Sequence, residues 1–406
     1  MTRSRPRLAV VTTHPVQYHA PVFRRLAERG RVDVRVFYEW EGASQTSAFD
    51  PGFGLRILWD VPLLGGYAHE FVPNVARDPG THHFGGIDNP DLLRRVTAWR
   101  PDAVLLFGWS SRTHLRVLRR LRGRVPLLFR GDSTLLDETP GVRQRLRRVW
   151  LRWVYRHIDV ALDVGIHNRA YFRAHGVQGH RLVRAPHAVD NARFEDPTGQ
   201  HEADAQAWRA RLGIRADAVV FLFAGKLEAK KAPEVLLDAF AGLGPTPSHL
   251  VFAGSGPLEG ALRARSVPNV HFVGFQNQSR MPTVYRLGDV LVLPSRGPGE
   301  TWGLAVNEAM AAGRPAVVSD RVGCAPDLVL DGLTGLVVPA GDVPALRDAL
   351  AALADDRARC ARMGAAAAGH IAGWTVDTLA DSIEVAVGKL SENRPTEHAA
   401  GATLPG

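Results

Sequence analysis

Residues 290–320 read VLVLPSRGPGETWGLAVNEAMAAGRPAVVSD, and this stretch predicts the fold of the region around it. The apolar run Val290–Leu293 predicts a strand, and the loop Ser295–Gly299 follows it. The next residues, from about Gly303 to Ala312, predict a helix, and the apolar run Ala316–Ser319 predicts another strand. A strand, a helix and a strand in this order are typical of a parallel sheet covered by helices.

Similar apolar runs recur on both sides of this stretch, with helix-like segments between them. They are rich in Val, Leu and Phe and do not alternate with polar residues, as expected for parallel strands buried on both faces. We therefore expect an α/β protein with two doubly wound, Rossmann-like domains that face each other across a cleft. The expected strands are 8–13, 32–37, 103–107, 125–129, 160–162 and 182–185 in the first half, and 219–223, 250–253, 271–273, 290–293, 316–319 and 336–338 in the second.

The polar stretch DNARFEDPTGQHEAD at 190–204 interrupts this pattern, so we expect the domain boundary there. Ligands of doubly wound sheets collect at the carboxyl ends of the strands, which makes the cleft between the domains the expected site. The predicted organisation is an N-terminal Rossmann-like domain (1–189), a linker (190–208), a C-terminal Rossmann-like domain (209–373), a helix that packs back on the N-terminal domain (374–390) and a disordered tail (391–406).

Composition excludes several classes of protein. The chain has 406 residues and a formal net charge of +9. Its two cysteines are too few for a disulfide-stapled scaffold or a cysteine-based zinc cluster. No run of 18 apolar residues occurs, so we expect no membrane-spanning helix and a soluble, cytoplasmic protein. Residues 1–200 carry 31 Arg, no Lys and 19 acidic residues, a net charge of +12. This half is either a solvated arginine-rich surface or a surface for nucleic acid, anionic lipid or a phosphorylated substrate.

A cluster of lysines follows the strand expected at 219–223. Lys226, Lys230 and Lys231 are three of the four lysines in the chain. They lie between a strand end and a helix that begins near Pro233, a place that suits a diphosphate. Taken alone, the cluster fits a solvated surface better than a ligand site.

Two glutamates flank the beginning of the helix expected at 303–312. Glu300 lies in the loop before it and Glu308 lies within it. The first amides of a helix lack intrahelical partners and can bind phosphate oxygens, while carboxylates beside them can accept hydrogen bonds from sugar hydroxyls. The alternative is one glutamate stabilised by the helix dipole and one on the surface. Gly254, in HLVFAGSGPLEGAL (249–262), permits a close backbone approach to a ligand but is a weak signal alone.

Together these motifs resemble those of the retaining glycosyltransferase family 4, which has the two-domain GT-B fold. GKLEAKKA (225–232) is similar to the family's donor-binding segment, and GETWGLAVNEAMAAGRPAV (299–317) is similar to its signature of two glutamates with seven residues between them. NVHFVGF, YRLGDVLVLPS, DGLTGLVVPAGD and the interdomain segment PHAVDNARF also occur in the family's order. The resemblance covers residues 186–355. It implies that the N-terminal domain (1–189) binds the acceptor and that the C-terminal domain (209–373) binds the nucleotide-sugar.

The resemblance implies an enzyme that transfers a hexose from a nucleotide-diphospho-sugar, with UDP favoured, and retains the anomeric configuration. It also implies no cofactor and no metal, because lysines and helix amides would neutralise the leaving diphosphate. The implied residues are Lys226 and Lys231 for the diphosphate, Glu308 for the ribose, Glu300 for the transferred sugar, Trp302, Gly303 and Leu304 for the phosphate and sugar cradle, Gly254 for the diphosphate or ribose, and Phe275 for the nucleobase.

The N-terminal half departs from the family pattern after its first strand. A Gly-Gly turn is common there in the family, whereas this chain reads THPVQYHA at 13–20. His14, Gln17 and His19 lie in this segment and could reach an acceptor hydroxyl or the leaving phosphate. Packing or surface roles are the alternative for both histidines.

Arg130 and Asp132 follow the strand expected at 125–129, where many members of the family have a functional histidine. Asp132 could orient the acceptor and Arg130 could bind an anionic group, while a turn-capping role is the alternative for Asp132. The candidate catalytic residues are Glu300, Asp132 and His14, and the candidate acceptor contacts are Gln17, His19 and Arg130. The mechanism usual for the family would let the donor phosphate accept the acceptor's proton, without a protein base.

Residues 141–159, GVRQRLRRVWLRWVYRHID, combine arginines and aromatic residues on one predicted helix. Such a helix either rests on an anionic membrane, here the inner face, or buries its aromatic residues in the domain core.

The expected partners are the donor and a sugar, lipid-linked or small-molecule acceptor, in polysaccharide, glycolipid or natural-product glycoside synthesis. Two other functions stay open: a GT-B nucleotide-sugar epimerase, which acts on the donor alone, and a basic nucleic-acid or membrane-binding module. Nucleic acid is not an expected partner, because no nucleic-acid-binding motif is recognisable.

Overall fold

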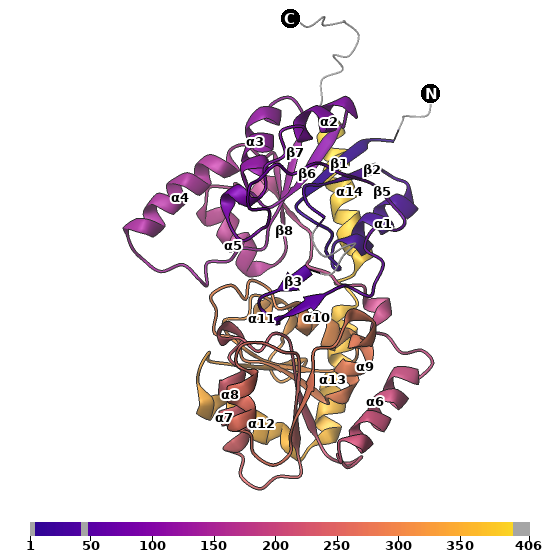
Figure 1. Cartoon of the computed structure of the whole chain (residues 1–406), viewed down its shortest axis with the longest axis vertical. Coiled ribbons are helices and arrows are strands. Elements are labelled where there is room, and N and C mark those ends of the chain that lie inside the picture. The colour runs from indigo at the N-terminus through magenta and orange to yellow at the C-terminus, as the bar shows by residue number, and fades with distance from the viewer. Residues whose placement is uncertain (1–4, 42–47, 393–406) are drawn as a thin grey trace, which may run out of the picture.

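The computed structural model describes residues 5–41 and 48–392. It contains two parallel sheets, one above the other in Figure 1. We call the seven-stranded sheet with its helices the N-terminal unit and the six-stranded sheet with its helices the C-terminal unit. The disordered tail expected at 391–406 lies outside the described residues, apart from its first two residues, which end the last helix.

The N-terminal unit is a doubly wound sheet. Its strands are β1 (Arg7–Thr12), β2 (Asp33–Tyr38), β5 (Ala68–Phe71), β6 (Ala103–Phe107), β7 (Leu127–Arg130), β8 (Val160–Asp163) and β9 (Leu182–Arg184), and its helices are α1 (Ala20–Arg29), α2 (Leu92–Ala98), α3 (Arg112–Leu121), α4 (Val142–Tyr155) and α5 (Ile166–Ala174). The strand order is β5-β2-β1-β6-β7-β8-β9, and all neighbours are parallel. A small antiparallel hairpin, β3 (Ala48–Asp50) and β4 (Leu55–Ile57), lies in the connection between β2 and β5.

The C-terminal unit repeats this plan with six parallel strands. Its strands are β10 (Val220–Ala224), β11 (His249–Ala253), β12 (Val270–Gly274), β13 (Val290–Leu293), β14 (Ala316–Ser319) and β15 (Gly335–Val338), and its helices are α6 (Gln200–Arg211), α7 (Pro233–Ala241), α8 (Glu259–Ala264), α9 (Met281–Leu287), α10 (Leu304–Ala311), α11 (Ala325–Leu328), α12 (Val343–Ala354) and α13 (Arg357–Ile371). The strand order is β12-β11-β10-β13-β14-β15. Short 3-10 helices lie at Phe84–Gly86, Gly179–Arg181, Asn191–Arg193, Ala229–Lys231 and Gln278–Arg280.

Each sheet separates two hydrophobic cores, as the uninterrupted apolar runs predict. In β1, Leu8 and Val10 join one core, whereas Ala9 and Val11 join the core on the opposite face. Successive side chains of a strand point to opposite faces, so a strand that is apolar throughout fills both. Each fully buried aliphatic side chain contributes roughly 1.5–3 kcal/mol. The predicted doubly wound architecture is confirmed.

All twelve expected strands are present, and three further strands were missed by the sequence analysis. β5 reads AHEF and lies at the sheet edge, where partly exposed polar side chains hide the strand pattern. β3 and β4 have three residues each, which is too short for a periodic signal.

The chain passes between the units twice, and both passages lie together. Val189, in the first, forms a bridge with Thr375, in the second. The segment 190–208, which we expected as a linker, includes the beginning of α6, and α6 packs against α9 of the C-terminal unit.

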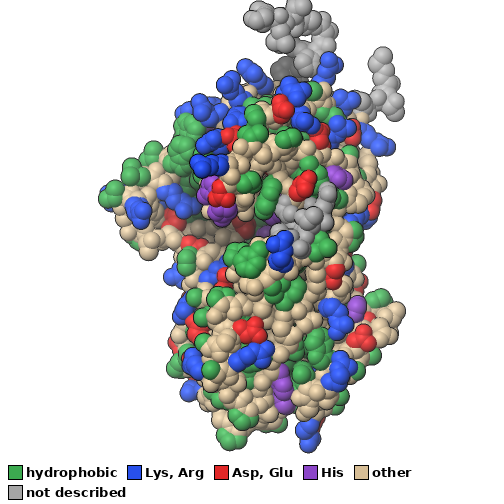
Figure 2. Space-filling view, viewed as in Figure 1, with side chains coloured by type: hydrophobic (Ala, Val, Ile, Leu, Met, Phe, Trp, Pro, Cys, Tyr) green, Lys and Arg blue, Asp and Glu red, His purple; other side chains and the backbone are tan. Residues whose placement is uncertain are grey.

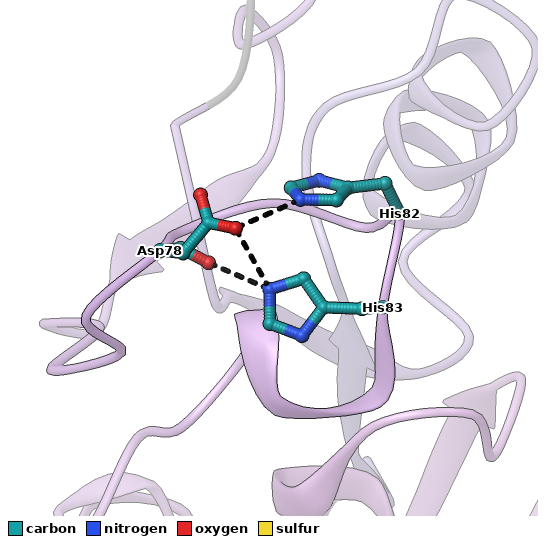
Figure 3. A group of neighbouring side chains, drawn as sticks. All are labelled: Asp78, His82 and His83. Carbon is teal, nitrogen blue, oxygen red and sulfur yellow. Dashed lines mark hydrogen bonds and ion pairs between the residues drawn. The ribbon is translucent and has the colours of Figure 1, made fainter.

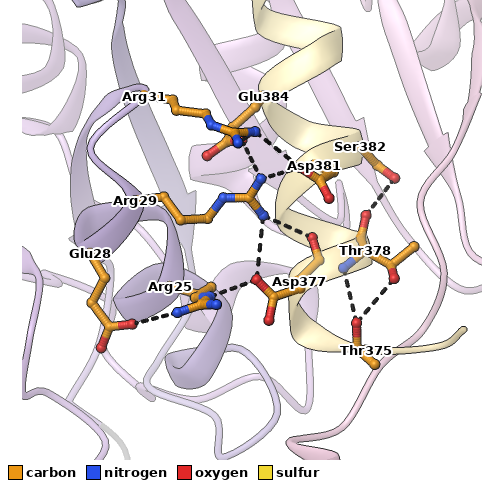
Figure 4. A network of polar contacts seen from close by, with 10 residues as sticks. All are labelled: Arg25, Glu28, Arg29, Arg31, Thr375, Asp377, Thr378, Asp381, Ser382 and Glu384. Carbon is orange, nitrogen blue, oxygen red and sulfur yellow. Dashed lines mark hydrogen bonds and ion pairs between the residues drawn. The ribbon is translucent and has the colours of Figure 1, made fainter. Parts of the chain in front are cut away.

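The last helix, α14 (Val376–Glu392), returns to the N-terminal unit and packs against α1 (Figure 4). Arg29 of α1 lies 3.1 Å from Glu384 and 3.5 Å from Asp377, and also pairs with Asp381. The side chains of Arg29 and Glu384 are only 13% and 7% exposed. Because these charges are shielded, loss of one partner would leave the other without its counter-charge and would loosen the docking of α14 more than loss of a surface pair would.

Helix α4 projects from the side of the N-terminal unit (Figure 1), and apolar side chains are visible on it in Figure 2. Its Leu151, Val154 and Tyr155 are buried, whereas the exposed apolar side chains are Val142, Leu146, Val149 and Trp150. The helix thus has one apolar face in the core and another in contact with solvent. None of the helices formed by the described residues combines the length and hydropathy needed to cross a bilayer.

Candidate active site

A cavity of about 420 Å³ lies between the two units, at the carboxyl ends of strands from both sheets. The sequence-predicted residues that line it are Gln17, Asp132, Lys226, Lys231, Gly254, Phe275, Glu300, Trp302, Gly303, Leu304 and Glu308. His14, His19 and Arg130 are not among the lining residues. Side chains that follow β7, β10, β11, β12 and β13 therefore meet in one space, as the topology of parallel sheets requires.

Lys231 and Glu300 form an ion pair at the edge of the cavity. The Nζ atom of Lys231 lies 2.5 Å from Oε2 of Glu300, and the Ser295 hydroxyl donates to the same oxygen at 2.9 Å. Both charged side chains are shielded, with 17% and 7% of their surfaces exposed. The pair fixes a cation and an anion in place before any ligand arrives, and either could exchange its partner for a ligand group.

Two glycines keep the backbone of the cavity close-packed. A Cβ atom on Gly254 would lie 1.8 Å from the carbonyl oxygen of Gly225, so the loops after β10 and β11 can meet only without a side chain there. Gly303 has φ +98° and lies directly before α10, and a Cβ there would lie 2.8 Å from Val322. The first residues of α10, Leu304 and Ala305, line the cavity, and the amides of a helix's first turn have no intrahelical partners. The indole of Trp302 is buried and donates to Asn307 at 2.8 Å, so its side chain supports this turn.

Glu308 is a buried carboxylate surrounded by hydroxyl groups. Its Oε2 accepts a hydrogen bond of 2.6 Å from the Tyr285 hydroxyl, and Tyr18 of the N-terminal unit interacts with it from across the cavity. Burial raises the pKa of Glu308 to about 7, although Tyr285, Arg193 and Tyr18 oppose the rise. Its carboxylate is therefore already adapted to accept hydrogen bonds from hydroxyl groups.

The sequence analysis missed Tyr18 and Tyr285. Tyr18 lies between the two residues Gln17 and His19 that we selected, and it packs against a core of the C-terminal unit. Tyr285 belongs to the segment YRLGDVLVLPS, where its ring reads as a core residue. Only their shared contact with Glu308, which depends on the fold, reveals their place in the site.

On the N-terminal side, Asp132 contacts the other unit directly. Its Oδ2 accepts a hydrogen bond of 2.7 Å from the Thr301 hydroxyl, next to Glu300. The carboxylate thus lies on the cavity wall next to the Glu300 segment, where it could orient a hydroxyl group.

The two histidines and Arg130 lie behind this wall. The Nδ1 atom of His14 is 2.9 Å from the Thr13 hydroxyl, and burial lowers the pKa of His14. Burial, together with the charges of His187 and Arg130, lowers the pKa of His19 to about 3. Both imidazoles are neutral at pH 7 as a result.

Arg130 already has two hydrogen-bonding partners in the backbone. It donates to the carbonyl oxygens of Ala185, at 2.8 Å, and Pro186, at 3.1 Å. Burial lowers the pKa of Arg130 to about 10, so it keeps its charge at neutral pH. Its guanidinium therefore ties β7 to the segment that leads into the first interdomain passage.

One group of side chains among the described residues has the composition of a metal site, and it does not line the cavity. Asp78, His82 and His83 gather in an exposed loop (Figure 3), with Asp78 Oδ2 3.1 Å and 3.3 Å from the two Nε2 atoms. The Nδ1 atom of His83 accepts a hydrogen bond from the backbone N–H of Gly85. Its Nε2 atom therefore carries the proton and donates to Asp78, so hydrogen bonding alone accounts for the cluster.

Comparison with known proteins extends these findings. The family described as "Glycosyl transferases group 1" matches residues 204–370. A D-inositol 3-phosphate glycosyltransferase of Xylanimonas cellulosilytica is 32% identical, over 96% of this chain and 98% of that protein. A GDP-mannose-dependent alpha-(1-6)-phosphatidylinositol monomannoside mannosyltransferase of Mycobacterium tuberculosis is 31% identical, over 84% of this chain and 86% of that one.

The fold has close relatives among solved structures as well. The crystal structure of HepE from Anabaena, in complex with UDP and glucose, superposes with a TM-score of 0.71 at 19% identity. The match covers 95% of this chain and all of HepE. The two sheets and the cavity between them are thus arranged as in the GT-B fold.

Proposed function

The chain belongs to the glycosyl transferases group 1 family, and on that premise we propose that it is a retaining glycosyltransferase. It transfers a hexose from a nucleotide-diphospho-sugar to an acceptor hydroxyl, in polysaccharide, glycolipid or natural-product glycoside synthesis. One observation carries the proposal: Lys226, Lys231, Glu300 and Glu308, taken from separate motifs of the sequence, line one cavity at the strand ends.

The residues of the C-terminal unit would divide the donor among them. Lys226 and Lys231 neutralise the diphosphate, with the free amides at the beginning of α10 as additional donors. Glu308 accepts hydrogen bonds from the ribose, and Glu300 accepts them from the transferred sugar. No metal or cofactor has a place in this proposal.

The chemical step breaks the bond between the sugar's anomeric carbon and the diphosphate oxygen and forms one to the acceptor oxygen. The acceptor's proton passes to the departing phosphate oxygen, which the lysines stabilise as it gains negative charge. Asp132, which lines the cavity from the N-terminal unit, orients the acceptor hydroxyl. This division of roles keeps donor recognition in one unit and acceptor recognition in the other.

The donor's base and the acceptor are the open parts of the proposal. UDP is the first candidate because it is frequent in the family, and GDP is the second because the mycobacterial relative is named for GDP-mannose. An anionic acceptor is favoured by the net charge of +12 over residues 1–200. The two relatives above are named for inositol phosphate and phosphatidylinositol acceptors, which are also anionic.

A thermal-shift screen against UDP-, GDP-, ADP- and TDP-sugars tests the donor site. A ligand that binds only the folded state raises the unfolding temperature with the logarithm of its excess over Kd. We expect one nucleotide class to stabilise the protein, and Glu308→Ala to weaken that effect. Glu259→Ala, on exposed α8, is the matched control. No stabilisation by any of the four classes would contradict the proposal.

We further propose that α4 contacts an anionic membrane at the cytoplasmic face. The exposed apolar residues Val142, Leu146, Val149 and Trp150 recur at helical spacing, with Arg143 and Arg145 between the first of them. Sedimentation with anionic vesicles should fall for the double variant Leu146→Glu, Val149→Glu. Leu333→Glu, at an exposed leucine of the C-terminal unit, should bind as the unaltered protein does. Equal sedimentation of all three proteins would contradict this part of the proposal.

A further inference from the structure

The β3–β4 hairpin of the N-terminal unit reaches across to the candidate donor site, and Figure 1 shows it at the junction of the two units. Its tip, 50–54, reads DPGFG. The carbonyl oxygen of Phe53 accepts a hydrogen bond of 2.9 Å from the Ser255 hydroxyl. Farther along, the carbonyl oxygen of Leu58 accepts one of 2.8 Å from the Asn277 side chain. The hairpin thus lies along the same strand ends that line the cavity.

Asp50 holds one of the two lysines assigned to the diphosphate. The Nζ atom of Lys226 lies 2.8 Å and 3.0 Å from the two carboxylate oxygens of Asp50. The backbone N–H groups of Gly52 and Phe53 donate to the same carboxylate, at 2.8 Å and 3.1 Å. Burial raises the pKa of Asp50, but Lys226 and these N–H groups lower it to a value below its ordinary one. The carboxylate is therefore charged and fixed in position by its own turn.

Gly52 lets the hairpin tip lie directly on the lysine. A Cβ atom at this position would lie 2.5 Å from Cδ and 2.6 Å from Nζ of Lys226. The tip and the lysine side chain are packed against each other, and 31% of the Lys226 side chain stays exposed at the cavity.

Two further residues of the N-terminal unit touch donor-site residues. The ring of Phe53 meets that of Phe275 edge to face, with centroids 4.9 Å apart, and also lies 5.0 Å from the Lys226 ammonium. Tyr18 places its hydroxyl against Glu308. Asp50 thus places a carboxylate on the lysine proposed to bind the diphosphate, and Phe53 places a ring beside the residue proposed to contact the nucleobase. Tyr18 places a hydroxyl on the carboxylate proposed to bind the ribose. Each of the three groups resembles the part of the donor that is expected at its position.

We propose that these residues act as an internal pseudo-ligand, so that a nucleoside diphosphate or its sugar must displace the hairpin tip before it can bind. The inference rests on the proposed function of the same site. A carboxylate and a diphosphate repel each other, so joint binding of both to Lys226 is less favourable than binding of the diphosphate alone. The donor then binds only the fraction of molecules with the tip displaced, and its apparent affinity is reduced by that fraction.

Calorimetric titration of Asp50→Asn with UDP, GDP, ADP, TDP and inorganic pyrophosphate tests the inference. The variant keeps the shape of the turn and removes the charge that competes for Lys226. We expect the nucleotide that the unaltered protein prefers to bind about tenfold more tightly, as for the loss of one charge-assisted contact. Asp78→Asn, which removes a carboxylate that does not line the cavity, should bind as before. Unchanged or weaker binding by Asp50→Asn overturns the inference.

Hydrogen exchange in the unaltered protein provides a second readout that needs no variant. Saturating UDP or GDP should speed exchange in peptides covering 48–60, because the tip leaves the site. Slower exchange there would show a lid that closes on the donor and would overturn the inference. If neither the unaltered protein nor Asp50→Asn binds UDP, GDP, ADP or TDP, the proposed function fails. If the unaltered protein binds one of them and Asp50→Asn binds it no more tightly, only the inference about the hairpin tip is overturned.

Discussion

The lysines of the C-terminal unit and the arginines of the N-terminal unit carry the same charge but have different kinds of partner. Lys226 and Lys231 line the cavity and pair with single carboxylates that also face it. Arg29 instead joins three acidic residues of α14, and Arg130 holds two backbone carbonyls. A compact ammonium can exchange one anion for another, whereas a guanidinium with several fixed partners holds elements together. The lysines therefore belong to the site, and these arginines belong to the fold.

Lys231→Ala should produce the largest loss of transfer. It removes a charged contact worth about 1.5–3 kcal/mol, so we expect kcat/KM to fall at least about tenfold. Steady-state kinetics with the donor found in the screen measures this. Lys389→Ala, which removes a lysine of α14 instead, should change kcat/KM by less than about twofold. Near-normal transfer by Lys231→Ala would contradict the claim that the lysines belong to the site while the arginines stabilise the fold.

Arg29→Ala should cost stability and leave donor affinity unchanged. Glu384 is only 7% exposed and would lose its most shielded partner, although Arg31 remains 3.1 Å away. We expect the free energy of unfolding to fall by about 1–2 kcal/mol, measured by urea denaturation. The exposed neighbour Arg25, replaced in the same way, should cost less than about 1 kcal/mol. Weaker donor binding by Arg29→Ala, at unchanged stability, would contradict the separation of roles.

Donor affinity should depend on pH through Glu308. Its pKa is raised to about 7, so lowering the pH from 8 to 6 converts the carboxylate to the neutral acid in most molecules. The neutral acid accepts weaker hydrogen bonds from ribose, and we expect donor affinity to fall about fivefold over this range. Titrations at several pH values measure it, and Glu308→Gln should abolish the dependence. A flat profile in the unaltered protein would exclude Glu308 as the titrating group.

Asp132→Asn should have the smallest effect and should act on the acceptor. The variant keeps the shape of the side chain and weakens one hydrogen-bonding position, so we expect transfer to fall about threefold with donor affinity unchanged. Asp137→Asn, at a carboxylate that accepts from the Gly299 backbone at 2.8 Å and does not line the cavity, is the control. Weaker donor binding by Asp132→Asn would show that the N-terminal unit contributes to the donor site.

The donor half of the site was predictable because its signals are local. Lys226, Gly254 and Glu300 each lie just after a buried strand, and parallel strands bring their carboxyl ends together whatever the details of packing. The strands could be predicted because each is an uninterrupted apolar run whose side chains fill the cores on both faces of its sheet.

The other half depends on contacts between distant segments. Asp50 stands in a hairpin with three-residue strands, and only its approach to Lys226, 176 positions away, gives it a place in the site. Tyr18 and Tyr285 meet at Glu308 through tertiary packing, which leaves no pattern in the sequence. Arg130 and His14 were candidates because they lie at strand ends. Their side chains instead hydrogen-bond to other groups of the N-terminal unit and do not line the cavity.

The donor-site assignment is tested most directly by calorimetric titration of the unaltered protein, Lys231→Ala and Glu308→Ala with UDP-, GDP-, ADP- and TDP-sugars. We expect the unaltered protein to bind one of these four classes and each variant to bind it at least about tenfold more weakly. Binding of equal strength in all three proteins, or no binding to the unaltered protein, would contradict the assignment of the donor site to the C-terminal unit.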